Sequence, residues 1–153
     1  MLFKKRHTKK ILLILLLAPV MCLSQNKLIE EYYDNGQIKR TGTHKKSSRN
    51  KTIEVKHGLW EYYYEDGQLL QRSEWRDGVY DGIFESYYKN GQRRELSISK
   101  TGTLLCQIHY YENGQLERTI VYDDKKRKAI IRCWDKNGEE IEKCFLSENE
   151  ILW

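Results

Sequence analysis

One phrase recurs along the chain at nearly constant spacing, and it combines an aromatic pair, an Asn-Gly or Asp-Gly step and a polar residue. It reads EYYDNGQIK from Glu31, EYYYEDGQLLQ from Glu61, SYYKNGQRR from Ser86, HYYENGQLE from His109 and, in degenerate form, CWDKNGEEI from Cys133. Its glycines are Gly36, Gly67, Gly91, Gly114 and Gly138, at spacings of 31, 24, 23 and 24 residues. A period of about 24 residues indicates a tandem repeat, in which each unit needs its neighbours to bury a core.

Each repeat has room for two short strands. Asn-Gly and Asp-Gly steps favour tight reversals because both residues tolerate positive φ, and a second set of turns is expected at RDGVYDG, around Gly78 and Gly82, and at KTGT, around Gly102. No window has a sustained helical period, and residues 25–153 contain no proline, which sheets admit only at edges and bulges. The predicted fold is therefore all-β, an antiparallel meander of tandem hairpins. Its strands are expected at Lys27–Tyr33, Gln37–Thr43, Gly58–Tyr64, Gln68–Trp75, Ile83–Tyr88, Arg93–Ser99, Leu104–Tyr111, Leu116–Tyr122, Ala129–Trp134 and Glu140–Leu146.

Two parts of the repeat domain depart from the regular pattern. The first interval is longer by seven residues because the segment HKKSSRNKTIEV, residues 44–55, is inserted there, and we interpret it as a basic loop. The fifth copy has Asp135 where the others have a second tyrosine, so we expect it to cap the array, as atypical terminal repeats do.

Stacking the repeats in register places like side chains beside one another. The residue four before each repeat glycine is aromatic, and the residue seven before it is mostly apolar; alternation along a strand puts these two positions on opposite faces. We expect each member of such a rib to cover its counterpart in the next hairpin, at about 0.2–1 kcal/mol per pair. The first rib is Tyr32, Tyr63, Tyr87, Tyr110 and Trp134, and the second is Ile29, Trp60, Phe84, Gln107 and Ile131. The candidate binding surface consists of Tyr32, Tyr63, Tyr87, Tyr110, Trp134, Trp60 and Phe84. The glutamines after the turn glycines, Gln37, Gln68, Gln92 and Gln115, are expected to bond the turn backbone.

The segment from Gly58 to Gln92 resembles two units of the variant MORN repeat placed end to end. The residues that match are Gly58, Trp60, Glu61, Tyr63, Gly67, Gln68, Gly78, Asp81, Gly82, Phe84, Glu85, Tyr87, Gly91 and Gln92. Weaker copies extend the resemblance from about Lys27 to Cys144. The resemblance implies an elongated antiparallel β-repeat with a scaffold or interaction role and no catalytic residues. Some bacterial relatives are labelled antitoxin components, and more distant MORN proteins have been linked to phospholipids.

Residues 1–24 have the pattern of a signal peptide, with a cationic start, an apolar run and a small polar end. The apolar run of residues 11–23 would cover only about 20 Å as a helix, which is short of a bilayer core of about 30 Å. We expect a signal helix, cleavage after Ser24 and export of a domain at 25–153 to the periplasm or the medium. The alternative is an outer-membrane lipoprotein attached through Cys22, and only that form would bring a membrane partner.

The net charge of +5 does not indicate a nucleic-acid partner. The chain has 27 Lys and Arg against 22 Asp and Glu, and the excess of five lies entirely in residues 1–24. The exported part is therefore neutral, with neither sign in excess to attract a polyanion.

The sequence contains no recognised catalytic motif. There is no phosphate-binding glycine loop, zinc-protease motif, nucleophile elbow or paired CxxC. His44 and His57 flank the insertion but are read as surface residues, and the turn aspartates are read as turn formers. We expect no catalytic, cofactor or metal site.

Three cysteines remain in the exported part, at Cys106, Cys133 and Cys144. On the predicted register Cys106 and Cys133 are two strand steps apart, about 10 Å, which exceeds the Cα limit of about 7 Å for a disulfide. Cys133 and Cys144 lie on neighbouring strands but about three residues out of step. We therefore expect three free, mostly buried thiols.

Two functional hypotheses follow. In the first, the sheet is a non-enzymatic platform for a protein partner, with an antitoxin-like or immunity-like role as one form of it, since a single-layer sheet exposes aromatic anchors and edge strands. In the second, the tyrosines stack on the sugar rings of an envelope or extracellular glycan.

Overall fold

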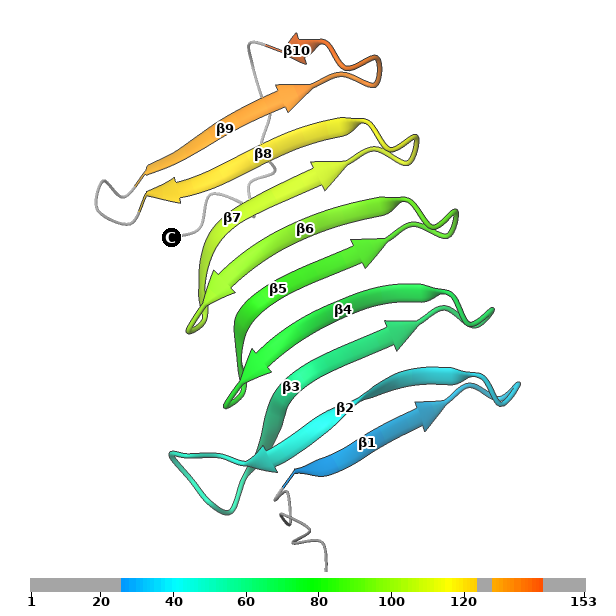
Figure 1. Cartoon of the computed structure of the whole chain (residues 1–153), viewed down its shortest axis with the longest axis vertical. Coiled ribbons are helices and arrows are strands. Elements are labelled where there is room, and N and C mark those ends of the chain that lie inside the picture. The colour runs from blue at the N-terminus through cyan, green and yellow to red at the C-terminus, as the bar shows by residue number, and fades with distance from the viewer. Residues whose placement is uncertain (1–25, 124–127, 142–153) are drawn as a thin grey trace, which may run out of the picture.

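The protein folds into one open antiparallel sheet. The structure, a computed structural model, describes residues 26–123 and 128–141. Ten strands pair in chain order (Figure 1), so the predicted all-β meander of tandem hairpins is confirmed. The predicted signal helix at 1–24 lies outside the described residues. The strands are β1 (Lys27–Tyr32), β2 (Ile38–Lys46), β3 (Glu54–Tyr63), β4 (Leu69–Arg76), β5 (Val79–Tyr87), β6 (Arg93–Lys100), β7 (Thr103–Tyr110), β8 (Leu116–Asp123), β9 (Lys128–Trp134) and β10 (Glu140–Ile141).

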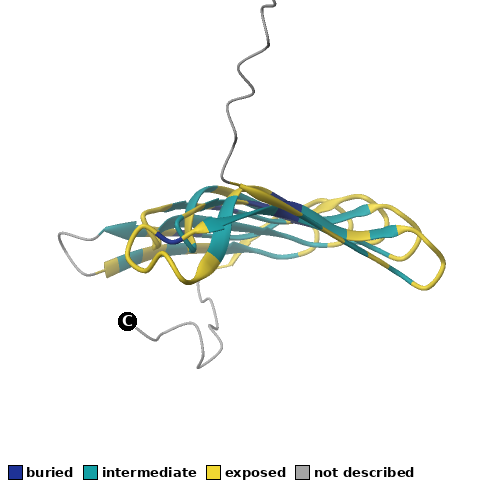
Figure 2. Ribbon diagram, turned by 90° about the horizontal axis from the view of Figure 1, so that it is seen from below, coloured by how far each residue is buried: buried dark blue, intermediate teal, exposed yellow. Residues whose placement is uncertain are grey.

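The described strands form a single layer (Figure 2). Residues directly opposite each other on paired strands share a face, and neighbours along a strand alternate between faces. We call the face that carries Tyr32, Tyr63, Tyr87, Tyr110 and Trp134 the rib face, and the face that carries Trp60 and Phe84 the core face. Within the described part of the chain, the buried apolar side chains are Trp60 and Ile120, so the core is thin.

Large and small residues alternate across the middle of the core face. Ring-bearing Trp60 and Phe84 on β3 and β5 are both paired with Ser73 on β4, and Ser97 on β6 is paired with Phe84. Gly42 on β2 lies directly under Trp60, because a Cβ there would come within 2.6 Å of Trp60 Cγ. The small side chains let each ring lie over the neighbouring strand, which is how a single layer can bury Trp60 completely.

Polar neighbours complete the cover of Trp60. Its indole Nε1 donates to the carbonyl of Thr43 at 3.0 Å, and the ring of His44 lies 5.1 Å away between centroids. Lys56 Nζ lies 4.7 Å from the centre of the indole ring, at cation–π distance. The Lys56 side chain and the His44 ring therefore cover the Trp60 indole, where a globular domain would use a second layer of helices or strands.

The expectation that rib rings cover one another is not met. The ring contacts of the described residues are His44–Trp60, Trp60–Tyr62, Trp75–Tyr80 and Tyr80–Phe84, and none joins two members of the first rib. The physical reason is that equivalent positions are two strands apart, at about 4.8 Å per step, with another strand between them. Rib residues therefore contact that intervening strand, as Tyr63 does opposite Leu69.

Successive repeats are joined instead by the second tyrosine of each aromatic pair. Its hydroxyl donates to the backbone carbonyl of the first aromatic residue in the next repeat. The bonds are Tyr33 to Tyr63 at 2.7 Å, Tyr64 to Tyr87 at 2.9 Å, Tyr88 to Tyr110 at 2.8 Å and Tyr111 to Trp134 at 2.9 Å. The repeated aromatic pair thus has two roles, a ring on the rib face and a hydroxyl clasp between hairpins.

The contribution of these tyrosine hydroxyl bonds to the free energy of unfolding can be measured by removing one hydroxyl at a time. Tyr64→Phe and Tyr88→Phe are each expected to lower the free energy of unfolding by about 0.5–1.5 kcal/mol, because a part-buried carbonyl loses its donor. Tyr32→Phe is the matched control, since its hydroxyl donates only to exposed Glu30 and its side chain is 57% exposed. Urea denaturation of the three variants checks the prediction, and equal losses at all three positions would contradict it.

The two edges of the sheet carry different turns. At the repeat phrase only the glycine has positive φ, for example +82° at Gly36, whose N–H donates to Tyr33 O at 2.9 Å. This is a turn of type I geometry followed by a left-handed glycine, so the predicted reversal is present and only the glycine uses positive φ. At the opposite edge both Asp77 (φ 51°) and Gly78 (φ 86°) use it, in the two-residue turn between β4 and β5. Gly82 was expected in that turn but lies within β5.

The asparagines of the repeat turns form a ladder along one edge. In each turn the side-chain oxygen accepts from the backbone N–H two residues on, as Asn90 does from Gln92 at 2.9 Å. The amide of Asn90 also donates to Glu112 O of the next turn at 2.9 Å. The same pair of bonds is made by Asn35 and Asn113. Asp66 accepts in the same way but has no amide to donate.

Asp66→Asn is therefore expected to stabilise the protein. The new amide would face the carbonyl of Lys89, which corresponds to the carbonyl that Asn90 reaches, and one exposed hydrogen bond contributes about 0.5 kcal/mol. Asn90→Asp is the matched reverse change, for which we expect a loss of similar size. Thermal unfolding of both variants measures the difference, and a lower melting temperature for Asp66→Asn would refute the ladder.

The turn glutamines contribute by packing. A Cβ added at Gly67, Gly114 or Gly138 would lie 3.3, 3.0 or 3.3 Å from the side-chain oxygen of Gln37, Gln92 or Gln115 in the preceding repeat. The amide of each of these three glutamines thus packs against the turn glycine of the next repeat, and a residue with a Cβ at that position would have to displace the amide.

The two ends of the insertion at 44–55 are strand, and the loop is shorter than expected. β2 continues to Lys46 and β3 begins at Glu54, with Lys46 paired to Glu54. Backbone pairing explains the difference, since residues on both sides of the insertion lengthen the same hairpin. Only residues 47–53 turn the chain, and Ser48 N–H donates to Asp77 Oδ1 at 2.8 Å in the neighbouring turn.

Candidate functional site

A row of charged side chains crosses the middle of the rib face. Glu61, Arg72 and Glu85 are directly opposite one another on β3, β4 and β5. Glu85 forms ion pairs with Arg72 and, at 2.9 Å, with Arg93. The Glu85 side chain is 5% exposed whereas the two arginines are 48% and 42% exposed. A buried carboxylate held between two guanidinium groups is fixed in place.

One rib-face tyrosine, Tyr63, contacts the same row. Tyr63 donates its hydroxyl to Glu61 Oε2 at 3.0 Å. Burial, together with this hydrogen bond to a carboxylate, raises the pKa of Tyr63, so the phenol stays protonated at neutral pH. The Tyr63 ring therefore presents a neutral, oriented hydroxyl group.

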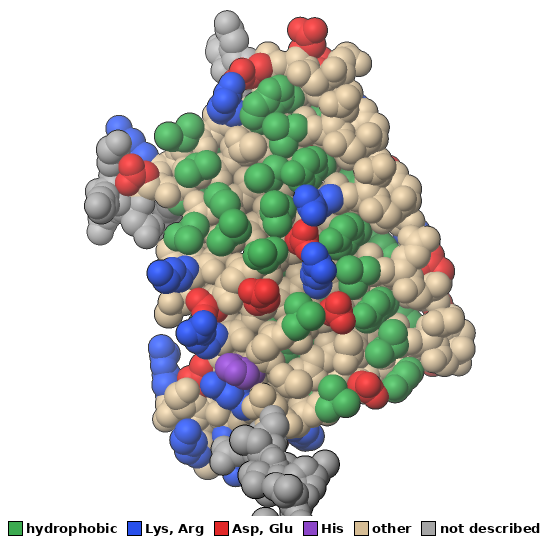
Figure 3. All heavy atoms as spheres, viewed as in Figure 1, with side chains coloured by type: hydrophobic (Ala, Val, Ile, Leu, Met, Phe, Trp, Pro, Cys, Tyr) green, Lys and Arg blue, Asp and Glu red, His purple; other side chains and the backbone are tan. Residues whose placement is uncertain are grey.

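An uninterrupted apolar stripe lies beside the charged row on β5 to β9. Its members are directly paired from strand to strand: Ile83, Ile98, Cys106, Val121 and Ile130. The four aliphatic members are 45%, 39%, 49% and 64% exposed, in that order. On the rib face, seen in Figure 3, apolar side chains gather over the C-terminal strands, and basic and acidic groups alternate beside them. A contiguous apolar surface of this kind is typical of a binding site.

The sequence-predicted residues divide into three groups. Tyr32, Tyr63, Tyr87, Tyr110 and Trp134 lie on the rib face, where Tyr32 is 57% exposed and the others are partly exposed. Phe84 lies on the core face and lines a pocket. Trp60 has no exposed surface, so it belongs to the core and offers no binding surface.

The apolar stripe and the arginines beside it are missing from the sequence prediction. Their signal is present in the alternation of β5, where Ile83, Glu85 and Tyr87 fall on one face. The predicted strand Ile83–Tyr88 contains these three residues, but the prediction chose its binding surface from the repeated aromatic positions alone.

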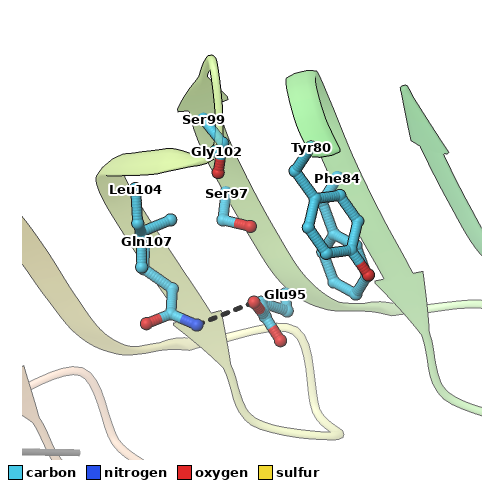
Figure 4. A pocket seen from close by; sticks show the side chains of 8 residues that line it. All are labelled: Tyr80, Phe84, Glu95, Ser97, Ser99, Gly102, Leu104 and Gln107. Atoms are coloured by element: carbon cyan, nitrogen blue, oxygen red, sulfur yellow. Dashed lines mark hydrogen bonds between the residues drawn. The ribbon is translucent and has the colours of Figure 1, made fainter. Parts of the chain in front are cut away.

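A pocket of about 320 Å³ opens on the core face between β5, β6 and β7 (Figure 4). Tyr80 and Phe84 form one wall, with ring centroids 6.1 Å apart and planes nearly perpendicular. Glu95 lies across from them and accepts a hydrogen bond from the Gln107 amide at 2.8 Å. Burial raises the pKa of Tyr80, which keeps its hydroxyl protonated as a donor. The pocket combines aromatic rings with a carboxylate and an amide.

The prediction of three free thiols is wrong for Cys133, which is disulfide-bonded. Cys106 is free and half-buried, and Cys144 lies outside the described residues. The prediction took strand pairing to continue to Leu146, whereas pairing of β9 with β10 is described at two positions only. A ladder sets Cα distances only where strands are paired, so it does not limit the bond that Cys133 makes.

No group of three or more His, Cys, Asp or Glu side chains within 26–123 and 128–141 is placed to hold a metal ion. In the same residues, no helix has the length and apolar character needed to cross a membrane.

Comparison with known proteins agrees with the hairpin repeat. A family model described as the MORN repeat variant matches residues 25–46, 56–77, 80–98 and 105–124, and each match falls on one pair of strands from β1–β2 to β7–β8. The degenerate copy around Gly138 is outside these matches. No curated protein is significantly similar in sequence. The four matches cover more than half of the chain, and the protein therefore belongs to the MORN repeat variant family.

Proposed function

We propose that this repeat protein is a non-catalytic platform for protein binding and that its rib face is the binding surface. The observation that carries the proposal is the apolar stripe, which leaves Ile83, Ile98, Val121 and Ile130 exposed in one continuous row. These aliphatic side chains are 39–64% exposed, so a partner that removes them from water lowers the free energy of the system. Adjacent tyrosines and arginines are the residue types that dominate protein interfaces.

A non-catalytic role is supported by the state of the polar groups near the stripe. Among the described residues Glu85 is the most buried carboxylate, and it is already paired with Arg72 and Arg93, so it is not free to act as a general acid or base. The exposed tyrosine rings lie beside aliphatic residues, so the face suits packing more than chemistry.

The proposal is tested by affinity capture from the native cell envelope and medium. Ile98→Lys and Val121→Lys place a charge in the stripe, and we expect both to lose the captured protein that the wild type retains in stoichiometric amount. Val79→Lys is the matched control, because Val79 is equally exposed at 38% but lies outside the stripe. Capture unchanged by both stripe variants would overturn the proposal. The identity of the captured protein also decides whether the platform neutralises a toxic partner, in an antitoxin-like or immunity-like role.

Export is the second part of the proposal, and residues 1–24 support it through their cationic and apolar pattern. We expect the native protein to begin at Gln25 in the periplasm or medium. N-terminal mass spectrometry distinguishes this form from a lipid-modified Cys22, which would place the protein on the outer membrane, and an intact Met1 would contradict both.

The core-face pocket favours a glycan as a second candidate ligand. Sugar rings pack on aromatic faces while their hydroxyls bond carboxylates and amides, and the pocket offers Tyr80, Phe84, Glu95 and Gln107 in these roles. Polysaccharide pull-down with Phe84→Ala tests this pocket, and Tyr63→Ala with Tyr87→Ala tests the rib-face tyrosines. Binding that survives both changes excludes the two surfaces as glycan sites.

A further inference from the structure

We infer that the pocket on the core face binds an organic ammonium group, the charged part of an alkyl amine or of an amino sugar. The pocket lies on the face opposite the apolar stripe, so the inference goes beyond the protein platform and does not depend on it. For the glycan candidate it adds one requirement, a positive charge on the sugar.

The pocket exists because one tryptophan of the preceding repeat has no counterpart. Trp75 stacks on Tyr80, with ring centroids 4.0 Å apart, and its indole Nε1 donates to Ser73 Oγ at 2.9 Å. Next to this indole, Ser73 has no exposed surface. The residue 24 positions after Trp75 is Ser99, which lines the pocket from β6. A ligand in the pocket would therefore take the place that an indole ring has one repeat earlier, and this place suits an apolar body.

The preceding repeat also holds an ammonium group of its own among its rings. Lys56 Nζ lies 4.7 Å from the centre of the Trp60 ring and 4.4 Å from the centre of the Trp75 ring, both at cation–π distance. The residue 24 positions after Lys56 is Tyr80, and the residue 24 positions after Trp60 is Phe84. The position that supplies the cation in one repeat is therefore part of the aromatic wall in the next.

A carboxylate stands where the preceding repeat has a neutral amide. Glu95 lies 24 positions after Gln71, and it alone is charged among the described residues that line the pocket. It accepts a hydrogen bond from Gln107 at 2.8 Å and forms no ion pair within the part of the chain that the structure describes. The adjacent Arg94 donates instead to Ser86 Oγ at 3.2 Å. The Glu95 carboxylate is thus placed to make a charge-assisted hydrogen bond to a cationic ligand.

Rings and a carboxylate together select a positive organic group. The face of an aromatic ring attracts cations, and the Glu95 carboxylate lies between the aromatic pair and Gln107 (Figure 4). Burial raises the pKa of Tyr80, and the neighbouring Tyr62 and Glu95 add to this shift, so the phenol stays neutral. A volume of about 320 Å³ is at the small end for ligand sites, which span about 300–1,000 Å³, and therefore suits one small amine.

The first experiment compares two probes of similar shape that differ in charge. Benzylammonium combines an apolar ring with an ammonium group, and benzyl alcohol is its neutral counterpart. In an NMR titration of the purified protein, we expect benzylammonium to shift the backbone amide signals of Ser97, Ser99 and Gly102, which line the pocket. The alcohol should bind about tenfold more weakly or worse. Equal affinity for the two probes, or no shift at these amides, overturns the inference.

Two variants copy residues that the preceding repeat already carries on this face. Glu95→Gln installs the amide of Gln71 and removes the charge, whereas Ser99→Trp installs the indole of Trp75 and fills the pocket. We expect each to weaken benzylammonium binding about tenfold or more, with an unchanged circular dichroism spectrum. Glu112→Gln is the matched control, because it removes an exposed carboxylate that does not line the pocket and should leave the affinity unchanged. Unchanged affinity in Glu95→Gln refutes a role for the charge.

Further probes distinguish the sources of the amine. Nα-acetyl-lysinamide carries a lysine side chain, glucosamine carries an amino group on a sugar, and glucose is the neutral control. Tighter binding of the lysine derivative assigns the pocket to an alkyl amine, and tighter binding of glucosamine assigns it to an amino sugar. Glucose that binds as tightly as glucosamine contradicts the inference and leaves a neutral glycan as the candidate ligand.

Failure of this inference and failure of the proposed platform have different signatures. Ile98→Lys changes the rib face, so it should abolish capture of the protein partner and leave benzylammonium binding unchanged. A protein that captures its partner but binds no ammonium probe refutes the ammonium site and keeps the platform. Ammonium binding together with capture that is unaffected by stripe variants keeps the site and removes the platform.

Discussion

Replacing Trp60 by alanine is expected to lower the free energy of unfolding by about 3–5 kcal/mol, the range for a large buried aromatic residue. Trp60 is the largest side chain with no exposed surface in the described part of the chain. Its loss would also remove the hydrogen bond from its indole to Thr43 O and the ring that Lys56 covers. Against a total stability of about 5–15 kcal/mol for a small domain, this change brings the protein close to unfolding at 25 °C.

Trp134→Ala is the matched control for that experiment. Trp134 is also a tryptophan of the repeat, but it lies on the rib face and remains partly exposed, with Arg132 over its ring at 5.4 Å. We expect a loss clearly below that of Trp60→Ala in urea denaturation followed by circular dichroism. Equal losses for the two variants would mean that burial on the core face does not organise the sheet.

Gly42→Ala is expected to lower the free energy of unfolding by about 2–3 kcal/mol, at the upper end for overpacking by a single methyl group. Gly42 lies in β2 and is not among the glycines with positive φ, so the added Cβ does not meet the strain of a left-handed backbone. The cost comes from contact, since that Cβ would lie 2.5 Å from Trp60 Cε2 and 2.6 Å from Cγ. The indole cannot move aside, because it is buried and held by its bond to Thr43 O.

A double-mutant cycle shows whether Trp60 is the cause. In a Trp60→Leu background the smaller side chain leaves room for the methyl group, so Gly42→Ala should cost less there than in the wild type. The difference is the interaction energy of the two positions, and residues in direct contact give about 0.5–3 kcal/mol. Additive losses would place the cost of Gly42→Ala elsewhere.

Much of the hairpin pattern could be read directly from residue types. Asn or Asp followed by glycine marks every repeat turn, and the regular spacing left only enough residues for two strands between them. Local backbone preference decides these features, because glycine adopts the left-handed conformation seen at Gly67 at little energetic cost, whatever its neighbours are. The strand ends near such residues were therefore predicted to within a few positions.

The sequence predictions were wrong where pairing between strands outweighs the conformational preference of single residues. Gly82 has positive φ yet continues β5, because its neighbours pair with β4 and β6. The insertion at 44–55 looks like a loop by composition but extends β2 and β3, because backbone hydrogen bonds stabilise it there. Likewise, Cys133 is disulfide-bonded in spite of a register argument that assumed ideal pairing beyond β10.

By itself the sequence determined the family, the all-β meander and the two edges of turns, because these depend on local conformational preference and on a repeat that can be counted. Only the tertiary structure decided that Trp60 is core while the apolar stripe is surface. Both are apolar positions in alternating strands, and their burial depends on which neighbours lie opposite. Gly42 and Ser73 let a ring lie flat on the core face, whereas the branched side chains of β5 to β9 stand together on the rib face with no described layer above them.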